Sequence, residues 1–88
     1  MELPKYILVS TQIRTENGPT IVGDADSDPA LMCQLEATLE SRLGNNFAEF
    51  VTSWAPRKVL NELAKMNYRV VAMSGIGQTC VWTLELRD

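Results

Sequence analysis

The clearest secondary-structure signal in the chain is the stretch YRVVAMSGIGQTCVWTLEL, residues 68–86, near the C-terminal end. Its first part is mostly apolar and contains two valines, and residues 74–77 contain two glycines, which allow a tight reversal of the chain. In its second part, inward and outward positions alternate, as they do in a strand with one face on a core. The stretch therefore predicts a β-hairpin with strands at residues 68–73 and 78–86. The face expected to lie on the core carries Gln78, Cys80, Trp82, Leu84 and Leu86.

The N-terminal part of the chain predicts two further strands. Residues 6–14, YILVSTQIR, begin with an almost entirely apolar run, which is typical of a strand covered on both faces. The sequence Asn17-Gly18-Pro19 favours a turn, because Asn and Gly accept positive φ and Pro fixes its own φ. A short strand at residues 20–22 follows, so this part of the chain predicts a hairpin or a wide β-turn.

The middle of the chain predicts a long first helix. Asp28 supplies a capping carboxylate, and Pro29 fits the first helical position. Gly44 offers the left-handed residue with which helices commonly end. Between these signals, apolar residues recur at helical spacing, so we expect one helix from Pro29 to just before Gly44. Its apolar stripe consists of Leu31, Met32, Leu35, Leu39 and Leu43.

A strand and a second helix are predicted next. Residues 47–51, FAEFV, indicate the strand, and Pro56 opens the helix. Asn67 can close that helix in the left-handed conformation. The apolar face of the helix is expected to carry Val59, Leu60, Leu63 and Met66.

Three large or charged side chains lie around the start of the second helix. Trp54 is in the short link before it, and we expect the ring to pack under its own loop or against a neighbouring subunit. Arg57 and Lys58 fall in the first turn, where the helix dipole disfavours cations. For these two residues, we favour solvated side chains over a contact with acidic residues of a partner.

The predicted order of elements is strand, strand, helix, strand, helix, strand, strand, which defines the fold class. We expect an α+β fold, with a mainly antiparallel sheet and two helices packed on one face, in a single domain spanning residues 1–88. A chain of 88 residues buries a small core and gains stability from assembly, so we expect an oligomer.

Composition excludes several classes of function. A net charge of −3 provides no basic field for a phosphate backbone, which argues against nucleic-acid binding. The longest apolar run is far too short to cross a bilayer, so we expect no membrane insertion and a cytoplasmic location, with the nucleus as a second compartment. Two distant cysteines, Cys33 and Cys80, predict free thiols in the core. The chain contains no histidine, which argues against an enzyme.

Two segments are candidates for binding chemistry. Residues 75–79, GIGQT, lack the lysine of a P-loop, so a hairpin tip that offers backbone groups and the amide of Gln78 to a zwitterion is favoured over a phosphate site. Residues 10–14, STQIR, place polar groups at the end of an apolar strand, and either a polar ligand or plain solvent explains them equally well. Asp24, Asp26 and Asp28 have the spacing of calcium ligands, but the downstream Gly and Glu are missing, so no metal is expected.

Several motifs together resemble the GTP cyclohydrolase I feedback regulatory protein family over residues 6–84. The motifs are STQIR at residues 10–14, GPT at 18–20, VGD at 22–24, SDP at 27–29, LGNNF at 43–47, PR at 56–57 and GIGQT at 75–79, with Trp82. The resemblance implies a non-catalytic homopentameric ring without cofactors, two of which cap a decameric GTP cyclohydrolase I. It further implies that L-phenylalanine favours a stimulated complex, and tetrahydrobiopterin an inhibited complex.

The resemblance also implies where phenylalanine and the partner enzyme bind. Matched to this chain, the binding residues are Gln12, Ile13, Arg14, Gly75, Ile76, Gly77, Gln78 and Thr79. Two other functions stay open as alternatives. One is a free-standing amino-acid-binding module that regulates a different biosynthetic enzyme. The other, a hydrolase of the acylphosphatase type, is disfavoured because residues 10–14 lack the glycines of its phosphate loop.

Overall fold

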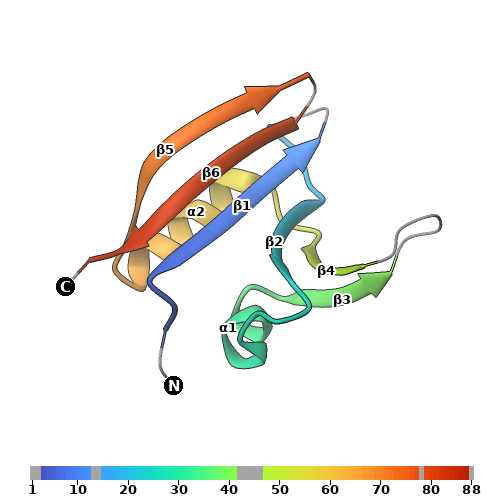
Figure 1. Cartoon of the computed structure of the whole chain (residues 1–88), viewed down its shortest axis with the longest axis horizontal. Coiled ribbons are helices and arrows are strands. Elements are labelled where there is room, and N and C mark those ends of the chain that lie inside the picture. Colours follow the sequence, from blue (N-terminus) through green and yellow to red (C-terminus); the bar gives the residue numbers. More distant parts are fainter. Residues whose placement is uncertain (1–2, 13–14, 42–46, 78, 88) are drawn as a thin grey trace.

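Six strands of the chain form one antiparallel sheet, and two helices cover it (Figure 1). The computed structural model describes residues 3–12, 15–41, 47–77 and 79–87, and the side chain of Ile76 lies outside this description. Within the described part, the strand order is β3-β4-β2-β1-β6-β5, and every pair of neighbours is antiparallel. The elements are β1 (Tyr6–Gln12), β2 (Thr20–Asp24), α1 (Pro29–Gln34), β3 (Ala37–Ser41), β4 (Ala48–Thr52), α2 (Pro56–Lys65), β5 (Tyr68–Ile76) and β6 (Thr79–Leu86).

The C-terminal hairpin is confirmed, and it is longer than predicted. Strand β5 continues to Ile76, which pairs with Thr79, so the two strands meet closer to the turn than predicted. Gly77 has a φ of 59°, a left-handed conformation that suits glycine in such a short turn. The register between β5 and β6 shifts between Val70 and Ala72, which marks a β-bulge in the edge strand.

The core lies between the sheet and the two helices. Both helices contribute fully buried leucines, Leu35 at the end of α1 and Leu63 in α2, and β6 contributes Leu84. Burying each such side chain contributes about 2 kcal/mol. The predicted stripe of α2 is confirmed, because Val59 and Leu63 are buried while Leu60 and Met66 pack against the core half-buried. Asn67, with a φ of 78°, follows α2 as predicted.

The prediction of one long helix in the middle of the chain is wrong. Its start is confirmed, since Asp28 Oδ1 accepts a hydrogen bond of 2.8 Å from the backbone amide of Ala30. The helix ends at Gln34, and Glu36 turns the chain with a φ of 53° into the additional strand β3. The helical spacing of Leu39 is coincidental, because this side chain is 51% exposed on β3. Leu43 and Gly44 lie outside the described residues.

Strand β4 gives β3 its structure. The strand predicted at residues 47–51 is confirmed, displaced by one residue, and β3 pairs with it along its whole length, from Ala37 opposite Thr52 to Ser41 opposite Ala48. Backbone hydrogen bonds to a neighbouring strand therefore override the local preference for a helix.

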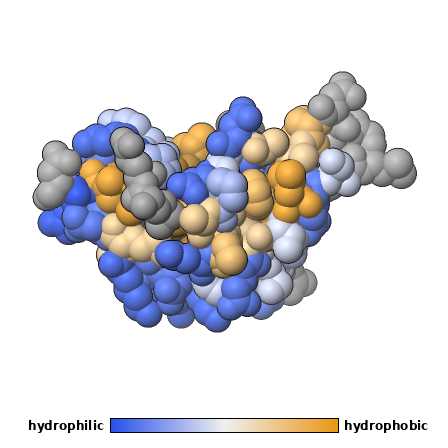
Figure 2. Space-filling view, turned by 90° about the horizontal axis from the view of Figure 1, so that it is seen from below, coloured by the Kyte–Doolittle hydropathy of each residue, from blue (hydrophilic) through white to orange (hydrophobic). Residues whose placement is uncertain are grey.

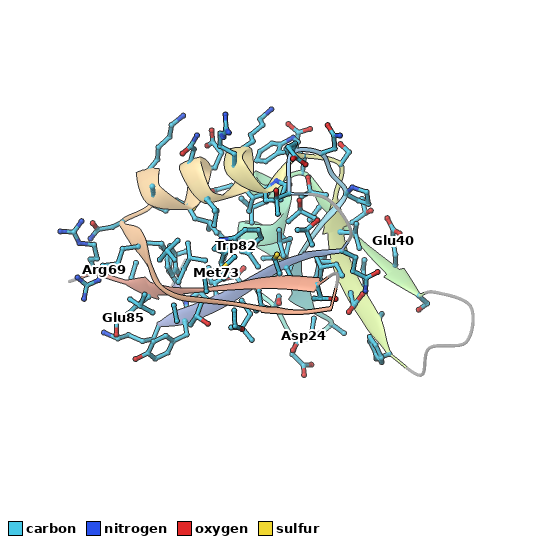
Figure 3. The ribbon with its side chains drawn as sticks, turned by 90° about the horizontal axis from the view of Figure 1, so that it is seen from above. Asp24, Glu40, Arg69, Met73, Trp82 and Glu85 are labelled. Carbon is cyan, nitrogen blue, oxygen red and sulfur yellow. The ribbon has the colours of Figure 1, made fainter. Side chains whose placement is uncertain are left out.

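The prediction that the first strand is covered on both faces is also wrong. Ile7 and Val9 face the core, whereas Tyr6 is 57% and Leu8 is 60% exposed. The reason is that both helices pack into one core, so the other face of β1 meets no layer in the described part of the chain (Figure 3). Figure 2 shows hydrophobic residues exposed across the middle and upper part of one side of the molecule, above a hydrophilic lower edge.

The two cysteines are free thiols as predicted, but neither is fully buried. Cys80 is half-buried on β6, and Cys33 is exposed. Position 33 faces away from the core because α1 is short and uses Leu31, Met32 and Leu35 to contact it. The prediction of a core position is therefore wrong for Cys33.

Candidate functional site

Three neighbouring strands end together and form the tip at which the predicted binding residues meet. Gln12 at the end of β1 pairs with Thr79 at the start of β6, and Thr79 pairs with Ile76 at the end of β5. Residues far apart in the sequence thus become direct neighbours across the sheet (Figure 1). The structure brings together Gln12, Gly75, Gly77, Thr79 and the backbone of Ile76. Ile13, Arg14 and Gln78 lie outside the described residues.

The two glycines of the tip differ in whether their backbone conformation requires glycine. A Cβ on Gly77 would meet no atom within 4 Å, so its left-handed φ is the sole constraint. A Cβ on Gly75 would lie 3.7 Å from the carbonyl oxygen of Thr79, an ordinary contact distance. Space is therefore open at both positions, and both glycines are exposed.

The connection that leaves β1 is held against the link before α2. A Cβ on Gly18 would lie 2.2 Å from the carbonyl oxygen of Ser53, so only glycine permits this approach. Thr20 Oγ1 donates a hydrogen bond of 2.8 Å to the carbonyl oxygen of Trp54. These contacts fix the path of residues 15–19, which enter the sheet again at β2.

A cationic side chain stacks on the aromatic ring of this link. Lys58 Nζ lies 4.3 Å from the centroid of the Trp54 ring, and the ring is half-buried against the core of its own subunit. Of the two packing arrangements expected for Trp54, the intramolecular one is observed. Arg57 and Lys58 are exposed as favoured from the sequence, but the stacking was missed. Its signal was present in the sequence, since a tryptophan four residues before a lysine can meet it at the start of a helix.

A charged cluster lies at the opposite end of the sheet, where β1, β6 and β5 run side by side. Tyr6 Oη donates a hydrogen bond of 3.0 Å to Glu85 Oε2, and Arg69 Nη2 lies 3.4 Å from Glu85 Oε1. Figure 3 shows Arg69 and Glu85 at this end. The hydrogen bond from Tyr6, followed by that from Arg69, lowers the pKa of Glu85 below its ordinary value. The same bond raises the pKa of Tyr6.

The acidic loop after β2 serves the backbone. Asp24 Oδ1 accepts hydrogen bonds from the amide of Asp26 at 3.0 Å and from Ser27 Oγ at 3.5 Å, while Asp28 caps α1. Across residues 3–12, 15–41, 47–77 and 79–87, no group of three or more His, Cys, Asp or Glu side chains could hold a metal ion. Over the same residues, no helix is long and apolar enough to span a membrane.

The fold is that of a small α+β protein with a six-stranded antiparallel sheet and two helices, and the tip is its candidate site. Comparison with known proteins narrows this class. Residues 5–87 match the model of the family described as GTP cyclohydrolase I feedback regulatory protein (GFRP). The chain therefore belongs to the GFRP family, whose members are regulatory proteins without catalytic activity.

Individual relatives agree with the family match. The chain is 60% identical over 79 residues to the GTP cyclohydrolase 1 feedback regulatory protein of Xenopus tropicalis, an alignment that covers 90% of this chain and 94% of the relative. The protein of the same name from Xenopus laevis is 58% identical with the same coverage. That from Danio rerio is 57% identical, over 90% of this chain and 89% of the relative. The family resemblance of the sequence motifs is confirmed.

Proposed function

We propose that this protein docks onto GTP cyclohydrolase I and regulates it, with tetrahydrobiopterin favouring an inhibited complex and L-phenylalanine a stimulated one. The observation that supports the proposal is 57–60% identity, over nine-tenths of the chain, to regulators named for this enzyme. Each effector stabilises the complex in which it has more contacts, so binding at the interface between the two proteins is itself the regulatory coupling.

The proposed phenylalanine site is the tip, at the interface with the enzyme. It comprises Gln12, Ile13, Arg14, Gly75, Ile76, Gly77, Gln78 and Thr79. Support comes from the register, which makes Gln12, Thr79 and Ile76 neighbours on three strands. The amide and hydroxyl groups of Gln12 and Thr79, with the backbone around Gly77, can satisfy the charged ends of an amino acid.

The proposed assembly is a homopentamer of single domains spanning residues 1–88, with two pentamers on each enzyme decamer. The small subunit and the exposed Tyr6 and Leu8 support burial against other proteins. We place the complex in the cytoplasm, with the nucleus as a second compartment.

A reconstituted assay tests the function directly. GTP cyclohydrolase I activity is measured with the cognate enzyme, with and without this protein, phenylalanine and tetrahydrobiopterin. We expect stimulation at low GTP when phenylalanine is present and inhibition when tetrahydrobiopterin is present. If neither effector changes the rate in the presence of this protein, the proposed regulation is wrong, and a screen of other biosynthetic enzymes follows.

A matched pair of variants tests the site. Thr79 lies at the tip, and Thr83 occupies the same face of β6 four residues away; both are half-buried. Thr79→Val is expected to raise the phenylalanine concentration needed for stimulation, while Thr83→Val leaves it unchanged. Equal responses of the two variants would show that the tip does not bind phenylalanine.

A further inference from the structure

The buried polar side chains of the described residues are three threonines that lie near the ends of their strands. Thr11 on β1 is 2% exposed, Thr20 on β2 is 0% exposed and Thr52 on β4 is 1% exposed. A hydroxyl that is taken out of water needs a hydrogen-bond partner, and each of these three finds one in a connecting segment. The buried threonines therefore tie the ends of three strands to the connections between them.

The main chain of Trp54 is held on both sides by two of these hydroxyls. Thr20 Oγ1 donates a hydrogen bond of 2.8 Å to the carbonyl oxygen of Trp54, and the backbone amide of Trp54 donates one of 3.3 Å to Thr52 Oγ1. Thr20 and Thr52 are direct partners across β2 and β4. Gly18 approaches the same carbonyl group so closely that a Cβ on it would lie 2.6 Å from the oxygen. The link before α2 is therefore fixed against the start of β2 and the connection that enters it.

The ring of Trp54 is fixed as well. It packs half-buried against the core, and Lys58 Nζ lies 4.3 Å from the ring centroid. Lys58 belongs to the first turn of α2, and Figure 1 shows that α2 starts at the tip end of the sheet and runs toward the opposite end. A chain of contacts thus leads from the surface of α2 through Trp54 to Thr20.

The connection between β1 and β2 begins at the tip and ends on these contacts. Gln12, a residue of the proposed site, is the last residue of β1, and the chain enters the sheet again at Thr20. Thr11, which precedes Gln12, donates a hydrogen bond of 3.4 Å to the carbonyl oxygen of Pro19, at the far end of the same connection. A shift of Thr20 or Pro19 against the link is therefore passed to the end of β1.

We infer that Thr20 and Trp54 are positioning residues for the phenylalanine site: neither belongs to the tip, and together they hold the connection that leaves Gln12 in the conformation that binds the effector. This inference rests on the proposed function. The apparent affinity for an effector falls by the same factor as the fraction of protein in the competent conformation. Loosening the contacts of Trp54 therefore raises the phenylalanine requirement without touching the tip.

The variants that test this inference change one contact each. Thr20→Val removes the hydroxyl and retains a β-branched residue, whereas Thr20→Ser keeps the donor and serves as the rescue. Ile7→Val is the control for loss of core packing, because Ile7 is buried on β1 at the end away from the tip. Lys58→Met removes the cation from the Trp54 ring, and Lys65→Met makes the same change of charge on the same helix; both lysines are exposed.

Stimulation of the cognate GTP cyclohydrolase I is measured at low GTP while phenylalanine is titrated, and inhibition by tetrahydrobiopterin is measured in parallel. Thr20→Val is expected to need about tenfold more phenylalanine and to reach the same maximum, as the loss of one buried hydrogen bond predicts. Lys58→Met is expected to need about threefold more. The remaining variants are expected to respond like the wild type. Inhibition by tetrahydrobiopterin is expected to be unchanged throughout, whereas a general loss of folded protein would weaken both responses.

The outcomes separate the inference from the proposed function. If the wild-type protein gives no response to phenylalanine, the proposed regulation by phenylalanine is wrong and the inference falls with it. If the wild type responds, and Thr20→Val needs no more phenylalanine than Ile7→Val, Thr20 has only a structural role; the inference is overturned and the proposed function stands. If Thr20→Val does not fold, the lysine pair decides, and an equal phenylalanine requirement of Lys58→Met and Lys65→Met overturns the inference.

Discussion

Replacing the two glycines of the tip, one at a time, tests whether the turn is held by backbone conformation or by lack of space. Gly77 has a φ of 59° and free space around it, so Gly77→Ala adds no clash and only forces alanine into a left-handed conformation. That conformation costs roughly 1–2 kcal/mol for a residue with a Cβ. Gly75 lies in β5, where alanine is favoured over glycine by roughly 0.5–1 kcal/mol and the nearest atom outside its own neighbours is 3.7 Å away.

The two variants are therefore expected to change stability in opposite directions. Urea unfolding followed by tryptophan fluorescence is expected to show Gly77→Ala less stable by about 1–2 kcal/mol. Gly75→Ala is expected to be more stable by roughly 0.5–1 kcal/mol. Gly77→Asn serves as the control, because asparagine tolerates the left-handed region, and it is expected to recover part of the loss. If Gly77→Ala is as stable as the wild type while Gly75→Ala is strongly destabilised, the tip is limited by space and our reasoning is refuted.

Three further predictions concern other parts of the molecule. Gly18→Ala places a Cβ 2.2 Å from the carbonyl oxygen of Ser53, and calorimetry is expected to show a loss of about 3 kcal/mol, whereas a wild-type melting temperature would contradict the close approach. In the folded protein, the pKa of Glu85 lies below its ordinary value of 4.5. The ionised carboxylate therefore stabilises the fold above pH 4.5, and this contribution is lost as the pH falls through the folded pKa. The stability difference between wild type and Glu85→Gln is therefore expected to shrink during acid titration, and a constant difference would argue against the Tyr6 hydrogen bond as its cause. Gln78→Ala is expected to raise the phenylalanine requirement for association with the enzyme by roughly ten- to hundredfold with the ring intact, as measured by calorimetry and size exclusion; an unchanged requirement would remove Gln78 from the site.

The elements that could be predicted from the sequence are those whose signals are local. The hairpin at residues 68–86 combines alternation with glycines at its turn, and α2 combines an opening proline with a complete apolar stripe. Both are confirmed because their neighbours in space agree with their local preference.

The errors arise where a distant strand decides the outcome. Residues 37–41 have the apolar spacing of a helix, yet pairing with β4 makes them a strand. Tyr6 and Leu8 belong to an apolar run, but their exposure depends on which face the helices cover, which no local pattern reports. The open groove lined by residues around 3–10, 21–32 and 47–49 could not be predicted for the same reason, because only the fold brings these segments together.

The strand order leaves β3 and β5 as the two outer edges of the sheet, and each edge carries a feature that opposes uncontrolled growth. Unpaired edges are templates on which identical chains can stack into filaments. β3 is only five residues long and presents the exposed carboxylate of Glu40, while the bulge between Val70 and Ala72 interrupts the regular hydrogen-bonding edge of β5. Short length, charge and a bulge are the means by which natural sheets avoid edge-to-edge aggregation. These features oppose stacking of the sheets even though Val71 and Met73 are exposed on β5, the longer of the two edge strands.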